Sequence, residues 1–251
     1  MGLSVILITK NEEANLKDCL ESISFANEII VVDSQSSDKT VEIAQSFGAK
    51  VENTSDWPGF GPQKNRALNL ATQDWVLSID ADERVTPELK DEILAVINGI
   101  SSADCYAIPR LSWYCGRFIK HSGWYPDYVD RLFKRGSAKF SDHLVHERLL
   151  PHGTVKKLKH HFLHYSFKNF SQVLQKIDGY STASAEQALK KGKKSSVLKA
   201  IGHGLWAFFR TYFLRLGFLD GQQGLALAIS NAEGTYYRYI KIWLLNQKQG
   251  Q

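Results

Sequence analysis

The first eighty residues alternate between short apolar runs and amphipathic stretches. Residues 3–8 and 28–32 are rich in aliphatic, mostly β-branched side chains. Both runs are too short for a helix and lack the alternation of a half-buried strand, which is typical of strands buried on both faces. Between them, apolar side chains recur at helical spacing over residues 16–23. This order predicts a βαβ unit.

The same alternation continues along the chain. It predicts a helix over residues 40–47, ended by Gly48, then a strand over 49–53, a helix over 63–71 and a strand over 75–79. Strands and helices in this order predict an α/β fold with a mostly parallel sheet and helices on both of its faces.

The pattern changes after residue 100. Aromatic side chains crowd residues 113–133, which is typical of core or of an antiparallel region that contacts substrate. Helical patterning returns from about residue 169, with a polar break at 190–196. Over residues 197–219 one helical stripe carries bulky apolar side chains: Val197, Ile201, Leu205, Phe208, Tyr212, Leu216 and Leu219.

Two interpretations of the stripe over residues 197–219 stay open. A basic amphipathic helix with bulky aromatics is typical of an interfacial membrane element. A helix packed on its own domain would show the same stripe. The neighbouring lysines favour the membrane, because each adds attraction to an anionic leaflet: Lys190, Lys191, Lys193 and Lys194.

Composition narrows the class of protein. With 43% apolar and 23% charged residues, the 251-residue chain is neither disordered, collagenous nor a coiled coil. A chain of this length needs no disulfide, and its three cysteines cannot all pair, so we expect a reducing, cytoplasmic setting. We expect no signal peptide, and no membrane span because Arg210 and Arg215 interrupt the most apolar segment.

Charge divides the chain in two. Residues 1–150 hold 16 basic and 22 acidic side chains, a net charge of −6, whereas residues 151–251 hold 15 and 4, a net charge of +11. The basic part is expected to attract phosphate, in nucleic acid, anionic lipid or a phosphorylated substrate, unless it is simply a solvated surface.

Polar residues follow each predicted strand, at the edge where open α/β sheets bind ligands. They are residues 9–12 after the first strand, 33–38 after the second, and Asp80 with Asp82 after the fourth. We interpret Asp38 as a cap for the helix at residue 40, and Asp33 as functional because it follows a buried run directly.

The carboxylates of Asp80 and Asp82 repel each other on a tight turn unless a hard cation lies between them or one is hydrogen-bonded elsewhere. Oxygen ligands of this kind favour Mg²⁺ or Mn²⁺, with phosphate oxygens completing the octahedron. Neither a dinucleotide fingerprint, a P-loop nor a nucleophile elbow occurs at the expected place, which disfavours oxidoreductases, P-loop NTPases and α/β-hydrolases.

Four ordered motifs resemble those of the family-2 glycosyltransferases of GT-A fold: residues 4–13, 31–40, 63–67 and 80–83. Three further motifs narrow the resemblance to bacterial lipopolysaccharide inner-core β-glucosyltransferases: residues 57–65, 125–133 and 145–147. The resemblance implies a GT-A catalytic domain over residues 1–165, with a nucleotide-sugar half to about residue 100 and an acceptor half beyond it. A basic helical extension over residues 166–251 would follow.

The resemblance also assigns roles to residues. Nucleotide-sugar binding is implied for Thr9, Asn11, Glu12, Asp33, Lys64, Arg66 and Asp80. Asp82, together with Asp80, would hold Mg²⁺ or Mn²⁺, and the cation would neutralise charge on the departing nucleoside diphosphate. Acceptor binding is expected at Trp124, Asp127 and Arg131.

An inverting transfer also needs a carboxylate that takes the proton of the acceptor hydroxyl. We choose Glu147, with Asp127, Asp130 and Asp142 as rivals. The alternative is that Glu147 is an ion-pair partner of Arg148 or Arg131.

His160, His161 and His164 invite a zinc hypothesis, but no cysteine or carboxylate lies near them in the sequence. We prefer packing or anion contact for these histidines. His164 is the one that would touch the diphosphate.

With the resemblance, these residues predict an inverting hexosyltransferase that moves a hexose, glucose from UDP-glucose, to a heptose of a lipid-linked lipopolysaccharide core, at the inner face of the cytoplasmic membrane. The alternative is another family-2 glycosyltransferase with a different donor or acceptor, because pocket shape decides both. We expect no nucleic-acid partner. A sugar-nucleotide nucleotidyltransferase is disfavoured because residues 9–12 lack the glycine-rich phosphate loop. A carbohydrate- or phospholipid-binding module would leave Asp80 and Asp82 unexplained.

Overall fold

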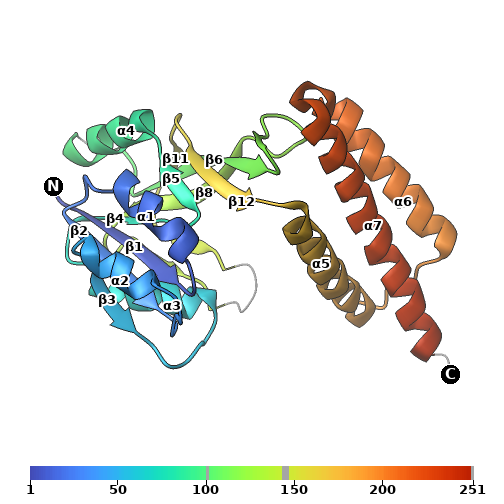
Figure 1. The fold of residues 1–251 in the computed structure, drawn as a ribbon, viewed down its shortest axis with the longest axis horizontal. Coiled ribbons are helices and arrows are strands. Elements are labelled where there is room, and N and C mark those ends of the chain that lie inside the picture. Colours follow the sequence, from blue (N-terminus) through green and yellow to red (C-terminus); the bar gives the residue numbers. More distant parts are fainter. Residues whose placement is uncertain (100–101, 143–146, 250–251) are drawn as a thin grey trace. The chain divides into compact units, whose positions relative to one another are not determined.

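The computed structural model describes residues 1–99, 102–142 and 147–249 (Figure 1). The chain forms two compact units. The first unit comprises Met1–Arg110 and Asp127–His164, and the second comprises Leu111–Pro126 and Tyr165–Gln251. The second unit therefore takes in the aromatic segment around Trp124 as well as the C-terminal helices.

The first unit begins with the alternation that the sequence predicts. Its elements are β1 (Leu3–Thr9), α1 (Glu13–Ser22), β2 (Glu28–Asp33), α2 (Thr40–Ser46), β3 (Lys50–Asn53), α3 (Phe60–Leu70) and β4 (Trp75–Ser78). β1 runs parallel to β2 and β4, and β2 runs parallel to β3. The predicted parallel sheet is confirmed, and the carboxyl ends of β1, β2 and β4 share one edge.

The rest of the first unit contributes α4 (Pro87–Asn98) and extends this sheet. The added strands are β5 (Glu83–Val85), β6 (Cys105–Tyr114), β8 (Asp127–Lys134) and β12 (Phe162–Phe167), with β11 (Val155–Lys157) parallel to β6. β9 (Ala138–Phe140) and β10 (Leu149–Pro151) pair with each other in a separate two-stranded sheet. The sheet order is β3-β2-β1-β4-β8-β6-β12-β5. β8 is antiparallel to β4, with Leu132 opposite Leu77. The residues of β8 that come before Leu132, such as Arg131, therefore lie beside the segment that follows β4, which contains Asp80.

Two apolar layers cover the sheet. Val5 and Leu7 of β1 pack in one cluster with side chains of α1, α2 and α4. Ile6, between them, packs in a second cluster with Ala67 of α3 and Phe133 of β8. Because neighbouring side chains of a strand point to opposite faces, helices cover both faces of the sheet, as the sequence predicts.

The helices of the second unit are α5 (Phe170–Lys190), α6 (Val197–Phe209) and α7 (Gly221–Gln249), and β7 (Arg117–Phe118) pairs with the end of β6. A π-helical turn, η1 (Arg210–Leu214), and a 3₁₀ turn, η2 (Gly217–Asp220), separate α6 from α7. α7 packs against both α5 and α6. No helix among the described residues combines the length and the apolar composition needed to cross a membrane.

The single helix expected over residues 197–219 is wrong, because α6 ends at Phe209. Leu216 has a φ of 55°, which a right-handed helix cannot contain. Asp220, 1% exposed, accepts hydrogen bonds from the backbone N–H groups of Lys120 and His121, each at 3.0 Å. These hydrogen bonds hold the chain around Asp220 against residues 120 and 121, so α6 does not continue to residue 219.

The faces of α6 differ from the expected stripe in a second way. Its buried side chains are the small ones of Ala200, Gly204 and Ala207. A Cβ at Gly204 would lie 3.3 Å from the carbonyl oxygen of Ala232 in α7, so the two helices approach closely there. Bulky apolar side chains of α6, η1 and η2 are instead between 44% and 81% exposed: Leu198, Ile201, Leu205, Trp206, Phe209, Phe213, Leu214, Leu216, Phe218 and Leu219. We call these ten residues the apolar face.

Candidate active site

Asp33 and Thr9 meet at the shared edge of β1 and β2. Their backbones are paired, and Thr9 Oγ1 donates a hydrogen bond of 2.8 Å to Asp33 Oδ2. Asp33 is fully buried and also accepts from the backbone N–H and the hydroxyl of Ser36, at 2.8 and 2.6 Å. Three donors thus fix this carboxylate at a strand end.

Asn11 and Glu12 join the loops that follow β1 and β2. Asn11 Oδ1 accepts from the backbone N–H of Ser37 at 2.8 Å, and the backbone N–H of Glu12 donates to Thr40 Oγ1 at 2.8 Å. Asp38 accepts from the backbone N–H of Thr40 at 3.0 Å. Asp38 is not the cap residue that we predicted, because the N-cap of α2 is Lys39, which makes no side-chain cap hydrogen bond. The hydrogen bonds between the two loops tie them into one rim.

A hollow of about 340 Å³ lies beside this rim, lined by Thr9, Glu12, Trp57 and Phe60 among others. The rings of Trp57 and Phe60 meet edge to face, with centres 5.0 Å apart, and each residue is about half exposed. Each ring offers an apolar face of the kind on which a nucleobase stacks, in the hollow that is also lined by Thr9, the partner of Asp33. The sequence motifs assign neither aromatic residue a binding role.

Arg66 lies next to the loop that carries Trp57. Its Nη2 is 2.7 Å from Asp56 Oδ2, and its Nη1 donates to Gln63 Oε1 at 3.0 Å. The hydrogen bond from Arg66 lowers the pKa of Asp56 below its usual range. Arg66 therefore links this loop to α3. A contact of Arg66 with a nucleotide stays a prediction.

Asp80, just beyond β4, lies within a cluster of alternating charges. Lys64 Nζ is 3.0 Å from Asp80 Oδ1, and Arg131 of β8 forms an ion pair with Asp80 Oδ2. Burial works to raise the pKa of Asp80, but the positive charges of Arg131 and Lys64 outweigh it and hold the pKa well below its usual range. Asp80 is therefore charged and already paired.

Glu83 contacts both Asp80 and Arg131 of this cluster. It is fully buried, its Oε2 accepts from the backbone N–H of Asp80 at 2.9 Å, and its Oε1 lies 3.2 Å from Arg131 and 3.6 Å from Arg110. A buried carboxylate held by two guanidinium groups fixes where both arginines point. Arg110 lies on β6, and no sequence motif assigns it a role.

Glu147 joins the same cluster through Lys64. Lys64 Nζ is 3.0 Å from Glu147 Oε1, and this lysine side chain is 7% exposed. The backbone pair between Ser141 and Arg148, with an N···O distance of 2.9 Å, holds the adjoining chain in place. Glu147 thus forms an ion pair, with Lys64 as its partner. Val145 and His146 of the same motif lie outside the described residues.

A cavity of about 670 Å³ opens over these charges. Its lining brings together predicted and unpredicted residues: Lys64, Asp80, Arg110, Asp127, Asp130, Arg131, Glu147 and Arg148. Arg110 Nε donates to Asp127 Oδ2 at 3.0 Å, and burial raises the pKa of Asp130. Two rivals for the base, Asp127 and Asp130, therefore share this cavity with Glu147. Asp142 is exposed, and Trp124 belongs to the second unit.

Asp82 and His164 lie close together, beyond β4 and on β12. β12 pairs with β5 so that His164 lies opposite Glu83, and His164 Nε2 is 3.4 Å from Asp82 Oδ2. His160 is engaged elsewhere, 3.0 Å from Glu92. The described residues contain no group of three metal-ligating side chains. A carboxylate and an imidazole nevertheless fit Mg²⁺ or Mn²⁺ when phosphate oxygens supply the other ligands, whereas Asp80 is neutralised by cations.

Known proteins are similar to this chain in sequence and in fold. The family model described as Glycosyl transferase family 2 matches residues 4–152. A glycosyltransferase of Rickettsia bellii is 32% identical over 257 residues, covering 96% of this chain and 85% of the relative. LpsC of Rhizobium meliloti, a lipopolysaccharide core biosynthesis glycosyltransferase, is 31% identical over 260 residues, covering 95% and 93%. The crystal structure of S. aureus TarS 1-349 in complex with UDP-GlcNAc has a TM-score of 0.52 at 17% identity, covering 100% of this chain and 93% of the other.

Proposed function

Since the chain belongs to glycosyl transferase family 2 and is a glycosyltransferase of GT-A fold, we propose that it transfers glucose from UDP-glucose to a heptose of a lipid-linked lipopolysaccharide core. One observation carries the proposal. Lys64 brings Asp80 and Glu147 together at the carboxyl edge of the sheet, and all three line a cavity large enough for a saccharide. The similarity to LpsC supports the choice of acceptor.

The rim formed by β1 and β2 binds the nucleoside in this proposal. Thr9 and Asp33 face the ribose, and Trp57 with Phe60 stacks on the uracil. Asp82 and His164 would hold Mg²⁺ or Mn²⁺, which supplies charge neutralisation at the diphosphate. Lys64 and Arg131 add fixed positive charge on the same side, so negative charge that develops on the leaving group is stabilised.

Glu147 acts as the general base. The acceptor hydroxyl oxygen attacks the anomeric carbon as the bond from that carbon to the phosphate oxygen breaks, and the hydroxyl proton passes to Glu147. UDP leaves with the bonding electrons, and the configuration at the anomeric carbon inverts. Asp127, Arg131 and Arg148 line the cavity from which the acceptor would approach.

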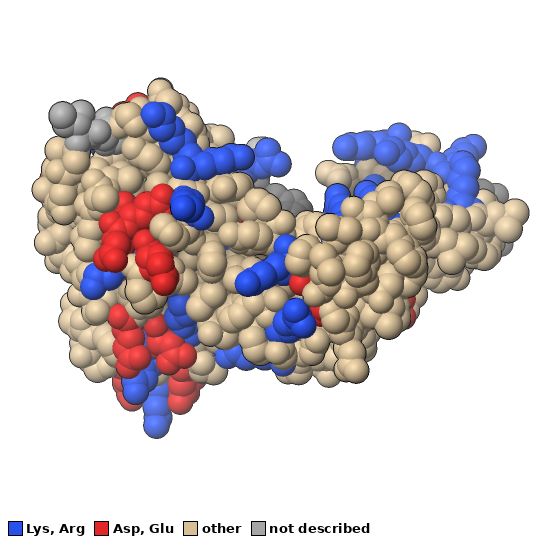
Figure 2. All heavy atoms as spheres, turned by 90° about the horizontal axis from the view of Figure 1, so that it is seen from above, with Lys and Arg blue, Asp and Glu red and all other residues tan. Residues whose placement is uncertain are grey.

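The second unit supports a place at the membrane. On the face drawn in Figure 2, basic side chains mark this unit and acidic ones are few. The side chains of its apolar face stay between 44% and 81% exposed, although rings such as those of Trp206 and Phe209 contact each other. Interfacial binding combines buried apolar area with basic charge. We therefore place the protein peripherally on the inner face of the cytoplasmic membrane, where a lipid-linked acceptor is within reach.

A donor screen tests the proposal. Purified protein is incubated with Mn²⁺ or Mg²⁺, a heptose-containing lipid acceptor and a panel of nucleotide-sugars, and products are weighed by mass spectrometry. We expect the mass of one hexose to be added with UDP-glucose and with no other donor at a comparable rate. Transfer from a different nucleotide-sugar would refute the donor, and transfer to a heptose-free acceptor would refute the acceptor.

A further inference from the structure

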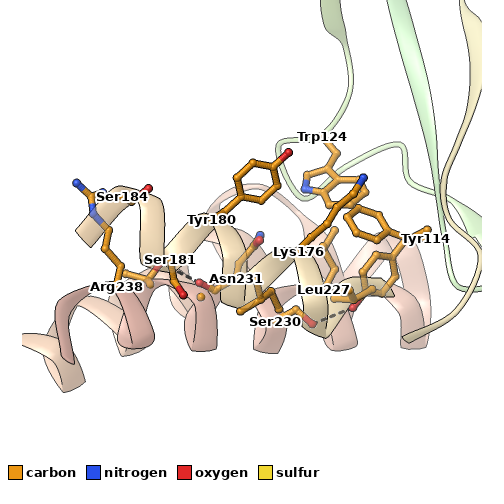
Figure 3. A pocket seen from close by; sticks show the side chains of 15 residues that line it. Tyr114, Trp124, Lys176, Tyr180, Ser181, Ser184, Leu227, Ser230, Asn231 and Arg238 are labelled. Atoms are coloured by element: carbon orange, nitrogen blue, oxygen red, sulfur yellow. Dashed lines mark hydrogen bonds between the residues drawn. The ribbon is translucent and has the colours of Figure 1, made fainter. Parts of the chain in front are cut away.

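The second unit contains a cavity of its own, separate in sequence from the residues of the active site. It has a volume of about 390 Å³ and lies between α5 and α7, beneath the aromatic segment that carries Trp124 (Figure 3). Much of its wall is apolar and comes from Tyr114, Phe167, Val173, Ile177 and Leu227. The proposed transfer reaction assigns this cavity no role beyond the acceptor contact predicted for Trp124.

Two basic side chains line this apolar cavity. Arg238 and Ser184 lie at one end in Figure 3, and Lys176 lies near Trp124 at the other. The described residues that line it include no Asp or Glu. Asp178 of α5 forms an ion pair with Lys241 at 2.7 Å. Glu233 of α7 does not line the cavity, although its charge acts on Tyr114, which does. The lining itself therefore carries two positive charges and no negative one.

Arg238 shows that a partner is missing. Its Nε is buried and has no hydrogen-bond acceptor among the described residues. Lys176 has an aromatic contact, with its Nζ 4.6 Å from the centre of the Phe167 ring. The Nε atoms of Arg84 and Arg131 also lack an acceptor, but the Nη atoms of these two arginines bind carbonyl or carboxylate oxygens. Buried donors are satisfied in nearly all folded proteins, so the guanidinium group of Arg238 at this cavity is suited to a ligand with acceptor oxygens.

An apolar wall with cations at its ends fits a molecule that is apolar along its length and anionic at its head. We propose that this cavity binds a phosphate-bearing lipid, with the phosphate at Arg238 and the chain along Val173, Ile177 and Leu227. The same chemistry is present in a membrane phospholipid and in the lipid part of the acceptor. The proposal does not depend on the transfer reaction, because it concerns binding without a donor.

Short-chain lipids that stay monomeric test the proposal on the full chain. Titration calorimetry with dihexanoylphosphatidylglycerol below its micelle concentration should show binding near one lipid per chain. Octyl glucoside, which is neutral, and inorganic phosphate, which has no chain, should each bind at least about tenfold more weakly. Equal binding of octyl glucoside would overturn the role of the anion, and equal binding of phosphate or of a soluble sugar phosphate would overturn the role of the chain.

Two variants locate the ligand. Arg238→Gln should weaken lipid binding about tenfold, the size of one lost charge-assisted hydrogen bond, whereas Arg210→Gln, an exposed change of the same kind in the same unit, should not. Equal affinities of these variants would place the lipid elsewhere and overturn the proposal.

Gly234 offers a second, independent test, since a Cβ there would lie 3.6 Å from Ile177, an ordinary contact distance. Gly234→Ala should fold and bind lipid, and Gly234→Leu should fill the cavity and abolish binding while circular dichroism stays unchanged. Lipid binding that survives in a folded Gly234→Leu protein would also overturn the proposal.

Competition identifies the source of the lipid. If the lipid-linked acceptor displaces dihexanoylphosphatidylglycerol and its delipidated saccharide does not, the acceptor's lipid is the natural ligand. If neither displaces it, the natural ligand is a membrane phospholipid. Displacement by the delipidated saccharide would show a saccharide site and overturn the lipid proposal.

Discussion

At the scale of single residues, Glu147 carries the prediction closest to the chemistry. Glu147→Gln preserves size and polarity but removes the proton acceptor. We expect kcat to fall by about 10²-fold or more, the usual contribution of a general base, with UDP affinity nearly unchanged. Initial rates at saturating donor and calorimetric titration with UDP measure the two quantities separately.

The matched control for this change is Asp142→Asn, because Asp142 is exposed and does not line the cavity. Its kcat should stay near that of the unaltered protein. Full activity of Glu147→Gln would transfer the role of base to Asp127 or Asp130. An equal loss of UDP affinity would mean that Glu147 serves donor binding instead.

Asp82 carries the prediction for the cation. Asp82→Ala should abolish transfer and weaken UDP binding in Mn²⁺ or Mg²⁺, and should leave the weaker binding in EDTA unchanged, because the carboxylate acts through the ion. Asp18→Ala, an exposed aspartate on α1, is the control. Calorimetry with and without the metal gives both values. Full transfer activity in EDTA would contradict the prediction.

Several residues of the candidate site could be predicted from the sequence because strand ends are easily recognised. Asp33 and Asp80 each follow a buried apolar run, and parallel strands bring such ends to one edge. Arg110 could not be found in this way, since it lies inside a long strand. The pairing of β6 with β8 places Arg110 opposite Asp127, and its contact with Glu83 of β5 joins residues far apart in the sequence. Trp57 lies in a loop, where periodicity gives no signal.

At the scale of elements, α6 buries small side chains and exposes large ones. Gly204→Val should place methyl groups against Ala232 and Tyr236 of α7, where even a Cβ has contacts of 3.3 Å. Overpacking of this kind costs about 1–3 kcal/mol. Each kcal/mol lowers the Tm of a chain of this size by about 2–4 °C. Calorimetric or fluorescence-monitored melting gives the Tm.

The neighbouring residue provides the control. Leu205 is 68% exposed, so Leu205→Gln should leave the Tm within about a degree. If Leu205→Gln destabilises the protein as much as Gly204→Val, the large side chains of α6 are core after all. The apolar face would then have no part in binding to a surface.

The contrast between α1 and α6 shows what apolar spacing can predict. In α1 the large residues Leu16 and Leu20 face the sheet, as expected for a helix on a broad apolar layer. In α6 the partner is another helix, and Gly204 permits close approach of the two backbones. The spacing of apolar residues identifies an apolar face of a helix but does not tell whether that face is buried. Spacing also does not predict that α6 ends at Phe209, because the hydrogen bonds of Asp220 with Lys120 and His121 join residues far apart in the sequence.

At the scale of the whole molecule, the opposite net charges of the two parts of the sequence predict salt-sensitive membrane binding. Changing Lys190, Lys191, Lys193 and Lys194 to Glu should release the protein from anionic liposomes and leave transfer to a short, soluble acceptor intact. Added salt should weaken binding of the unaltered protein, because ions screen the basic charge over about 8–10 Å at physiological strength. Sedimentation with vesicles measures both effects.

An equal change of charge in the first unit is the control for this experiment: Lys17, Lys39, Lys50 and Lys90 to Glu, all exposed positions. If both quadruple variants lose vesicle binding to the same extent, the binding depends on the net charge of the protein and not on the position of the lysines. If the unaltered protein fails to sediment with anionic vesicles at low salt, the membrane assignment is wrong, and the surplus charge serves a phosphorylated saccharide instead.

Lys64 has a consequence for the order of events in turnover. Its ammonium group is shared between Asp80 and Glu147, at 3.0 Å from each. If Glu147 is the base, a diphosphate that binds beside Asp80 competes for this ammonium group and leaves Glu147 freer to accept a proton. We therefore expect ordered turnover, with the sugar donor entering first and UDP leaving last. UDP should inhibit competitively against the donor and noncompetitively against the acceptor, and a random-order pattern would show that Lys64 imposes no such sequence.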